Sequence, residues 1–130
     1  MKTMMLVALA LFASTVPQPA KADDDGFLKA SELLDRCKAH DRYDNNDPIS
    51  PQERVYVGYC LGYVRGWTEA TSTGAATDPN GHHLYFQPTV TISQVIHVFQ
   101  KYLADHPQEE NVRAHWILFR ACEAAKILTP

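Results

Sequence analysis

The chain has 130 residues, of which 45% are hydrophobic and 21% are charged, and its formal net charge at pH 7 is −3. This length is enough for one domain with a single core and too short for several domains. Lysines and arginines form no cluster that could bind phosphates, which argues against nucleic acid as a partner.

The N-terminus has the pattern of a secretory signal peptide. Lys2 precedes an apolar run over residues 4–16, and Ala20-Lys21-Ala22 then supplies an A-x-A cleavage site before three aspartates. The run is about a dozen residues long, whereas a membrane-spanning helix needs roughly 20. We therefore expect export with removal of residues 1–22, which leaves residues 23–130 as one domain without a membrane anchor. A retained membrane helix is the weaker alternative.

The first predicted helix follows the cleavage site. Apolar residues repeat in it at helical spacing, at Phe27, Ala30, Leu33, Leu34 and Cys37. This amphipathic helix should end near His40. The next segment, residues 41–48, is polar and rich in aspartate and asparagine, so it is predicted to be a loop.

A capping box predicts the start of the second helix. Ser50-Pro51-Gln52-Glu53 supplies the cap hydroxyl, a proline at the first helical position and the glutamate, and the helix should run to about Thr71. Within it, GYCLGYVRGW (residues 58–67) spaces three glycines four apart beside an aromatic stripe. Each glycine costs about 1 kcal/mol relative to alanine in a helix interior. The glycines therefore predict close approach of a neighbouring backbone, with a ligand groove as the weaker alternative.

Two further helices complete the prediction. A second capping box, Thr91 to Gln94, begins the third helix, which should end around residues 105–107. The last helix is marked by apolar residues three or four apart, namely Val112, Trp116, Phe119 and Cys122. The predicted fold class is therefore all-α, a small bundle of four main helices.

Six histidines and three cysteines raise the alternatives of a metal site and of a Cys–His catalytic pair. No group of histidines, cysteines or acidic residues has a recognised ligand spacing, so no metal or cofactor is predicted. Cys37 and Cys60 lie on apolar helix faces, and in an oxidising compartment a disulfide is the usual fate of such residues, so no catalytic residue is predicted. His97 and His115 lie within helices and are expected to be structural.

Four segments together resemble the Rap/Tai family of immunity proteins. They are LLDRC (33–37), YCLGYVRG (59–66), VTISQ (90–94) and KYLADHP (101–107). The resemblance implies a disulfide-containing, all-helical, periplasmic protein, often a homodimer, which binds and blocks a papain-like peptidoglycan amidase effector delivered by type VI secretion. An inhibitor of this kind has no enzymatic activity of its own. The Cys-x-Pro usual before the third helix is replaced by residues 85–88, YFQP, so a second disulfide there is excluded.

Specific residues can be assigned on this basis. Cys37 and Cys60 are expected to form the one disulfide, because antiparallel packing of the first two helices brings their sulfurs together. Cys122 should remain reduced and buried. The loop over residues 73–88 is expected to bind the partner, as is the loop over residues 106–111. The candidate contacts are His82, His83 and Tyr85.

A second class of function is also consistent with a small, exported, helical chain held by one disulfide. This alternative is a periplasmic helical binding module similar to the acid-stress chaperones. Such a chaperone exposes apolar surface when its carboxylates and histidines become protonated. An inhibitor instead needs a fixed, preorganised surface.

Overall fold

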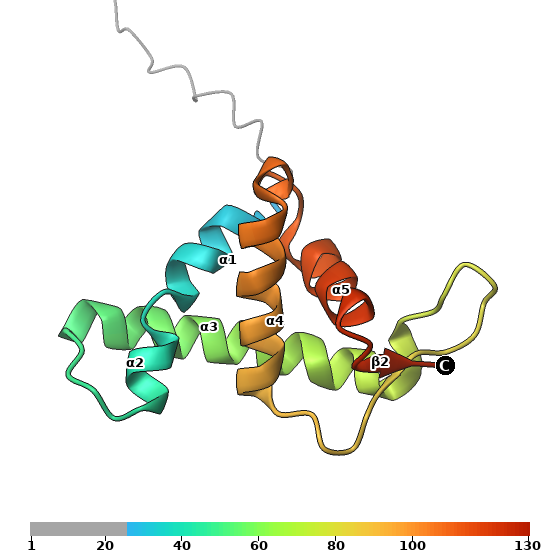
Figure 1. The fold of residues 1–130 in the computed structure, drawn as a ribbon, viewed down its shortest axis with the longest axis horizontal. Helices are drawn as coiled ribbons and strands as arrows, with labels where there is room; N and C mark the ends of the chain where they lie inside the picture. The colour runs from blue at the N-terminus through green and yellow to red at the C-terminus, as the bar shows by residue number, and fades with distance from the viewer. Residues whose placement is uncertain (1–25) are drawn as a thin grey trace, which may run out of the picture.

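The computed structural model describes residues 26–130, and these residues form a mostly helical fold (Figure 1). The helices are α1 (Ala30–Cys37), α2 (His40–Asp44), α3 (Pro51–Ala70), α4 (Ile92–Asp105) and α5 (Ala114–Ala124). Strands β1 (Tyr85–Phe86) and β2 (Leu128–Thr129) pair antiparallel, with Tyr85 opposite Thr129. No helix in this range is both long enough and apolar enough to cross a membrane. The predicted signal peptide, residues 1–22, lies outside the described residues.

Both predicted capping boxes are present. The Ser50 hydroxyl accepts a hydrogen bond from the backbone N–H of Glu53 at 3.1 Å, and the Glu53 carboxylate accepts one from the N–H of Ser50 at 2.8 Å. Thr91 and Gln94 make the same reciprocal pair at 3.2 and 2.8 Å. Each box satisfies N–H groups that have no partner within the helix, so α3 and α4 begin where the sequence predicts.

The core lies between α3 and the three helices α1, α4 and α5. Helices α1 and α4 pack against α3, and α5 packs against α1 and α4. The largest fully buried side chains include Leu33, Val57, Val64, Val95, Ile96, Phe99, Ile117 and Leu118. The predicted disulfide is confirmed, because Cys37 of α1 is bonded to Cys60 of α3 with their Cα atoms 5.2 Å apart. Cys122 is free and buried, also as predicted.

The loop predicted over residues 41–48 is wrong for its first half, whereas residues 45–48 are non-helical as predicted. Residues His40–Asp44 form the short helix α2. The cause is tertiary, since Ala39 and His40 are buried whereas residues 41–48 are exposed. Two buried residues at its start therefore hold a polar segment against the bundle in helical form.

The prediction that the glycine face of α3 packs against a neighbouring backbone is wrong. Gly58, Gly62 and Gly66 are exposed, and a Cβ added to any of them would meet nothing within 4 Å. The buried residues of α3 are Val57, Cys60 and Val64. At about 100° per residue these lie on the opposite side of the helix from the glycines. Helix α3 therefore buries one face and presents its glycines outward.

The apolar stripe predicted for the last helix is wrong at Trp116, which is 52% exposed. Cys122 is buried, and Val112 and Phe119 are partly buried against the core. The core face consists instead of Ala114, Ile117, Leu118, Ala121 and Cys122. Phe27, which the sequence placed on the first helix, precedes α1 and is 48% exposed. Phe27 and Trp116 therefore lie at the surface and not in the core.

Replacing both Cys37 and Cys60 with serine should lower the free energy of unfolding by about 3 kcal/mol, because the disulfide no longer restricts the unfolded chain. Denaturant unfolding measures this loss, and Cys122→Ala is the control, since it leaves the disulfide intact and should cost less. Peptide mapping under non-reducing conditions that found Cys122 bonded to either partner would contradict the assignment.

Candidate functional site

A hairpin between α3 and α4 is the most prominent projection of the structure (Figure 1). We define it as residues 76–84. Thr77 and His83 form an antiparallel bridge, and the N–H of Leu84 donates to the carbonyl of Ala76 at 2.9 Å. Leu84 is only 3% exposed and anchors the hairpin to the core. This part of the predicted loop is therefore an ordered structure with a buried base.

The tip of the hairpin is organised by Asp78. One carboxylate oxygen of Asp78 accepts hydrogen bonds from the N–H groups of Asn80 and His82, at 2.8 and 2.9 Å. The other lies 3.0 Å from Nδ1 of His82. These bonds, above all the one from the His82 side chain, lower the pKa of Asp78. Asp78 is therefore ionised at neutral pH and fixes the turn.

The base of the hairpin is fastened by His83. Its Nδ1 lies 2.8 Å from the carbonyl oxygen of Gly74 and donates a hydrogen bond to it in that tautomer. Gly74 has a φ of 79°, and an added Cβ would lie 3.3 Å from the His83 ring. His82 and His83, predicted as partner contacts, thus also make contacts within the chain that maintain the hairpin. Tyr85 is 46% exposed and begins β1.

An aromatic groove of about 390 Å³ lies next to the hairpin. It is lined by Trp67, Ala70, Thr71, Ala76, Thr77, His115, Trp116 and Phe119. The rings of His115 and Trp116 lie 5.2 Å apart, and Phe27 lies 5.9 Å from His115 on the other side. Burial, with a smaller effect of Arg113, lowers the pKa of His115, which favours the uncharged ring at pH 7.

The groove was not predicted from the sequence. The spacing of Val112, Trp116 and Phe119 indicated an apolar face, and that face was assigned wholly to the core. Trp116 and Phe119 also line the groove, on the side of α5 opposite the fully buried Ile117 and Leu118. Exposed tryptophan beside a groove is typical of protein-binding surfaces.

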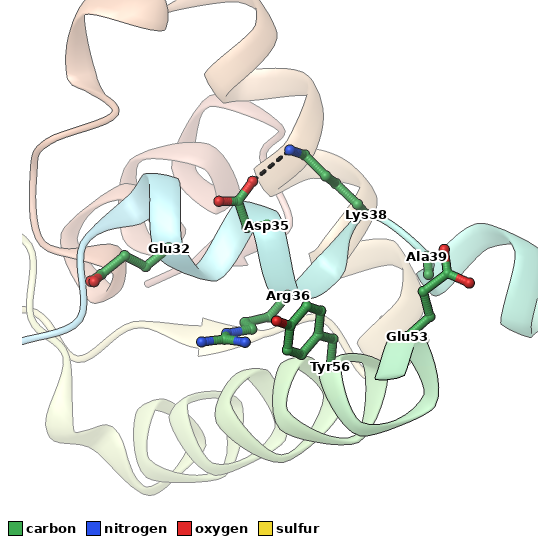
Figure 2. A pocket seen from close by; sticks show the side chains of 7 residues that line it. All are labelled: Glu32, Asp35, Arg36, Lys38, Ala39, Glu53 and Tyr56. Atoms are coloured by element: carbon green, nitrogen blue, oxygen red, sulfur yellow. Dashed lines mark ion pairs between the residues drawn. The ribbon is translucent and has the colours of Figure 1, made fainter. Parts of the chain in front are cut away.

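A second cleft, of about 410 Å³, lies between α1 and the start of α3 (Figure 2). The guanidinium of Arg36 lies over the Tyr56 ring, 4.2 Å from its centroid. The carboxylates at the rim already have partners: Asp35 pairs with Lys38, and Glu53 pairs with Arg42. The bond from the Ser50 N–H and the contact with Arg42 lower the pKa of Glu53. This cleft is charged, internally paired and less suited to anchor a protein than the aromatic groove.

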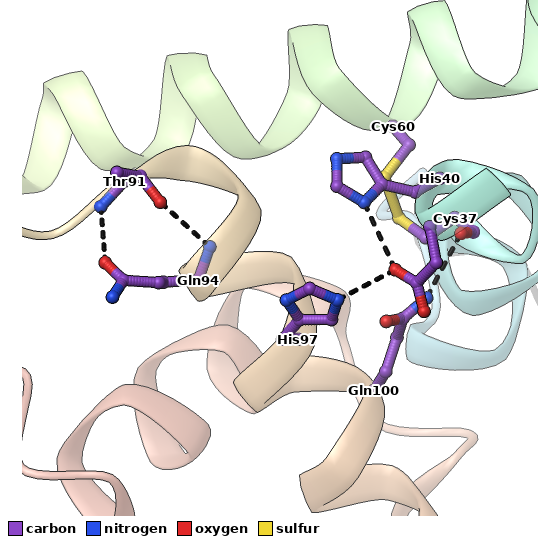
Figure 3. Close-up of polar contacts among 8 residues, drawn as sticks. Cys37, His40, Cys60, Thr91, Gln94, His97 and Gln100 are labelled. Carbon is purple, nitrogen blue, oxygen red and sulfur yellow. Dashed lines mark hydrogen bonds and ion pairs between the residues drawn. A yellow bond between two sulfur atoms is a disulfide. The ribbon is translucent and has the colours of Figure 1, made fainter. Parts of the chain in front are cut away.

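The buried histidine His40 lies beside the disulfide (Figure 3). Nδ1 of His40 is 3.4 Å from an Asp41 carboxylate oxygen, and Nε2 of His97 is 2.9 Å from the same atom. Asp41 thereby links α2 to α4. The neighbouring sulfurs of Cys37 and Cys60 are oxidised, so they offer no thiol that a histidine could activate.

Cys122, which is not in the disulfide, is also unsuited to act as a nucleophile. Burial raises the pKa of Cys122 to about 12, so its sulfur is a neutral thiol at pH 7. Within residues 26–130, no group of three histidine, cysteine or acidic side chains is placed to hold a metal ion.

The second predicted contact loop, residues 106–111, makes contacts within the chain. Pro107–Glu109 form a 3₁₀ turn, and the His106 ring stacks on the Tyr102 ring with their centroids 4.2 Å apart.

The sequence was compared with protein-family models, with curated proteins and with solved structures. A family model for the Rap1a immunity proteins matches residues 29–125, which include all five helices and the hairpin. Neither the curated proteins nor the solved structures give a significant match.

Gly74→Ala should destabilise the hairpin by about 1 kcal/mol or more, because alanine is strained at this positive φ and its Cβ would press on His83. Gly81→Ala is a matched control: Gly81 has a φ of 84°, but an added Cβ would meet nothing within 4 Å. Denaturant unfolding of the two variants should show the larger loss for Gly74→Ala. Equal losses would mean that the His83 contact does not matter.

Acid should loosen the hairpin tip. The lowered pKa of Asp78 contributes stability that is present above the ordinary aspartate value of 3.8 and is lost as pH falls through the lower folded value. The backbone amide NMR signals of Asn80 and His82 should therefore titrate below pH 3.8. In Asp78→Ala both signals should lose this transition. A transition at or above the ordinary value in the parent protein would show that the turn does not stabilise the carboxylate.

Proposed function

The chain belongs to the Rap1a immunity protein family, and we propose that it is a periplasmic immunity protein that inhibits a papain-like peptidoglycan amidase. Family membership implies an immunity protein whose partner is an effector of type VI secretion. The amidase target, the periplasmic location and the absence of enzymatic activity are our proposals. The amidase rests on the resemblance of the four sequence segments, and the location on the signal-peptide pattern of residues 1–22.

The observation that carries this proposal is the pairing of the hairpin with the aromatic groove. Ala76 and Thr77 belong to the hairpin and also line the groove, so the two form one continuous surface. This partner-binding surface contains a narrow projection and an apolar hollow. A projecting hairpin fits the cleft of an enzyme, while an adjacent hollow accepts a side chain from the enzyme's rim.

Inhibition by this surface is steric and needs no reaction. A papain-like amidase cuts a substrate held in a cleft beside its nucleophilic cysteine, and a hairpin lodged in that cleft excludes the peptidoglycan. The bonds to Asp78 and Gly74 hold the hairpin in one conformation before binding. Little conformational entropy is then lost on association, which favours tight binding.

The residues of the surface have different roles in the proposal. Tyr85 of β1 directly follows the hairpin, and Trp116 lines the groove. Both are exposed, and each offers a large apolar body with a polar tip. They are the expected contacts that contribute most to affinity. His82 and His83 are proposed to contact the partner directly. They also keep the hairpin in its conformation through their bonds to Asp78 and Gly74. The homodimer implied by the resemblance stays a prediction.

Replacing Tyr85 and Trp116 with alanine should weaken binding of the amidase by roughly 2 kcal/mol or more per residue, as expected for central aromatic contacts. The assay mixes purified mature protein with the amidase encoded nearest to it and follows peptidoglycan cleavage. Tyr43→Ala is the matched control: Tyr43 lies on α2 and is 44% exposed, against 46% for Tyr85. It should inhibit like the parent.

Two outcomes would contradict the proposal. Full amidase activity at excess parent protein would exclude inhibition of that enzyme. Normal inhibition by the Tyr85→Ala and Trp116→Ala variants, with loss in Tyr43→Ala, would place the contact elsewhere. Circular dichroism and melting temperatures confirm that each variant is folded.

A further inference from the structure

One cationic side chain in the cleft between α1 and α3 has no carboxylate partner within the described part of the chain. Arg36 makes no ion pair with any residue of 26–130. Its guanidinium carbon instead lies 4.2 Å from the centroid of the Tyr56 ring and 5.8 Å from that of the Tyr59 ring. A guanidinium has several N–H donors and no acceptor, so one without a carboxylate partner can bind an anion.

The three carboxylates that line this cleft are held by other groups. The pairs are Glu32 with the backbone N–H of Lys29, Asp35 with Lys38, and Glu53 with Arg42 and the backbone N–H of Ser50. Figure 2 shows Asp35 and Lys38 on the side of α1 away from α3, whereas the Arg36 side chain extends toward α3. The cleft therefore contains a positive group that its own acidic residues do not pair with.

The Tyr56 ring fixes the position of this charge. Arginine is a long side chain with many rotamers, and an arginine that is already held over a ring loses less entropy when it binds a ligand. Arg36 and Tyr56 are both only partly exposed. A charge in such a place is screened less by water than a fully exposed one, which strengthens its attraction for an anion.

The geometry favours a carboxylate over other anions. A guanidinium that lies over a ring keeps the N–H groups along its edge available, and two parallel N–H bonds match the two oxygens of a planar carboxylate. Glu32 also lines the cleft, and its negative charge disfavours a phosphate dianion more than a carboxylate with one charge. The cleft volume of about 410 Å³ lies within the range of small-ligand sites.

We propose that the cleft between α1 and α3 is a binding site for a ligand with a carboxylate group, which Arg36 binds while Tyr56 orients the guanidinium. The carboxylate belongs to an acidic side chain or to the C-terminus of a peptide. This site lies on α1 and the first turns of α3, whereas the partner-binding surface lies at the C-terminal end of α3 and on α5. Carboxylate binding therefore does not depend on the proposed inhibition of an amidase.

Two matched pairs of ligands test the site on the mature protein. N-acetylglycylglycine has a free C-terminal carboxylate that its amide lacks, and N-acetylglutamate methylamide has a side-chain carboxylate that its glutamine analogue lacks. At least one acid should shift the backbone amide NMR signals of residues 35–39 and 53–59 until they saturate. Its neutral analogue should bind about tenfold more weakly or less, because it lacks the charge-assisted bonds. The acid that binds more tightly identifies the source of the carboxylate.

Substitutions then assign the binding to Arg36. Arg36→Gln should abolish the saturable shifts, and Arg36→Lys, which keeps the charge but lacks the planar fork, should bind several-fold more weakly than the parent. Tyr56→Phe keeps the ring and should bind like the parent, whereas Tyr56→Leu should weaken binding. Arg65→Gln is the matched control: Arg65 lies exposed on α3, does not line the cleft and carries the same charge. It should bind like the parent.

Several results would overturn the proposal. One is the absence of binding by both acids, or equal binding of the acids and their neutral analogues, a comparison that needs no variant. Undiminished binding in Arg36→Gln, or an equal loss in Arg65→Gln, would show that Arg36 does not bind the ligand. Tighter binding of inorganic phosphate than of either acid would contradict the carboxylate. Tyr85→Ala and Trp116→Ala should bind the acids like the parent, which separates this test from that of inhibition.

Discussion

The disulfide between Cys37 and Cys60 is the constraint on which the rest of the structure depends. It joins the end of α1 to the middle of α3, and Gln100 of α4 donates a hydrogen bond to the carbonyl of Cys37 at 3.1 Å. Three helices therefore meet at one point. A domain of this size has a limited core, and the covalent link compensates by restricting the unfolded chain. Beside it, the buried residue His40 fixes the start of α2.

This central junction gives α3 its organising role. The inner face of the helix carries the core, its outer face stays open, and its C-terminal end leads into the hairpin. The groove then forms where α3, the hairpin and α5 come together, with Trp67 on one wall and Trp116 on another. One rigid helix thus positions the partner-binding surface at its end.

Local signals in the sequence predicted much of the fold, and tertiary context decided the rest. Capping boxes at Ser50 and Thr91 fixed two helix starts, because they depend on neighbouring residues alone. Periodicity located α5 but chose the wrong face, since a helix with two apolar faces does not reveal which one is buried. Glycine spacing predicted close approach of a neighbouring backbone, but spacing alone does not distinguish a packed helix face from the exposed one that is observed. The hydrogen bond that fastens the hairpin joins His83 to the carbonyl of Gly74, nine residues earlier, and no local sequence pattern predicts it.

We propose that one continuous surface, made by the hairpin and the aromatic groove, binds the effector. Hydrogen–deuterium exchange of the mature protein, alone and mixed with the neighbouring amidase, tests it most directly because every backbone amide reports its own protection. We expect the backbone amides of residues 76–85 and 115–119 to exchange more slowly on binding, and those of residues 32–39 to exchange at an unchanged rate. Protection confined to the charged cleft beside Arg36, with the hairpin exchanging as in the free protein, would contradict it.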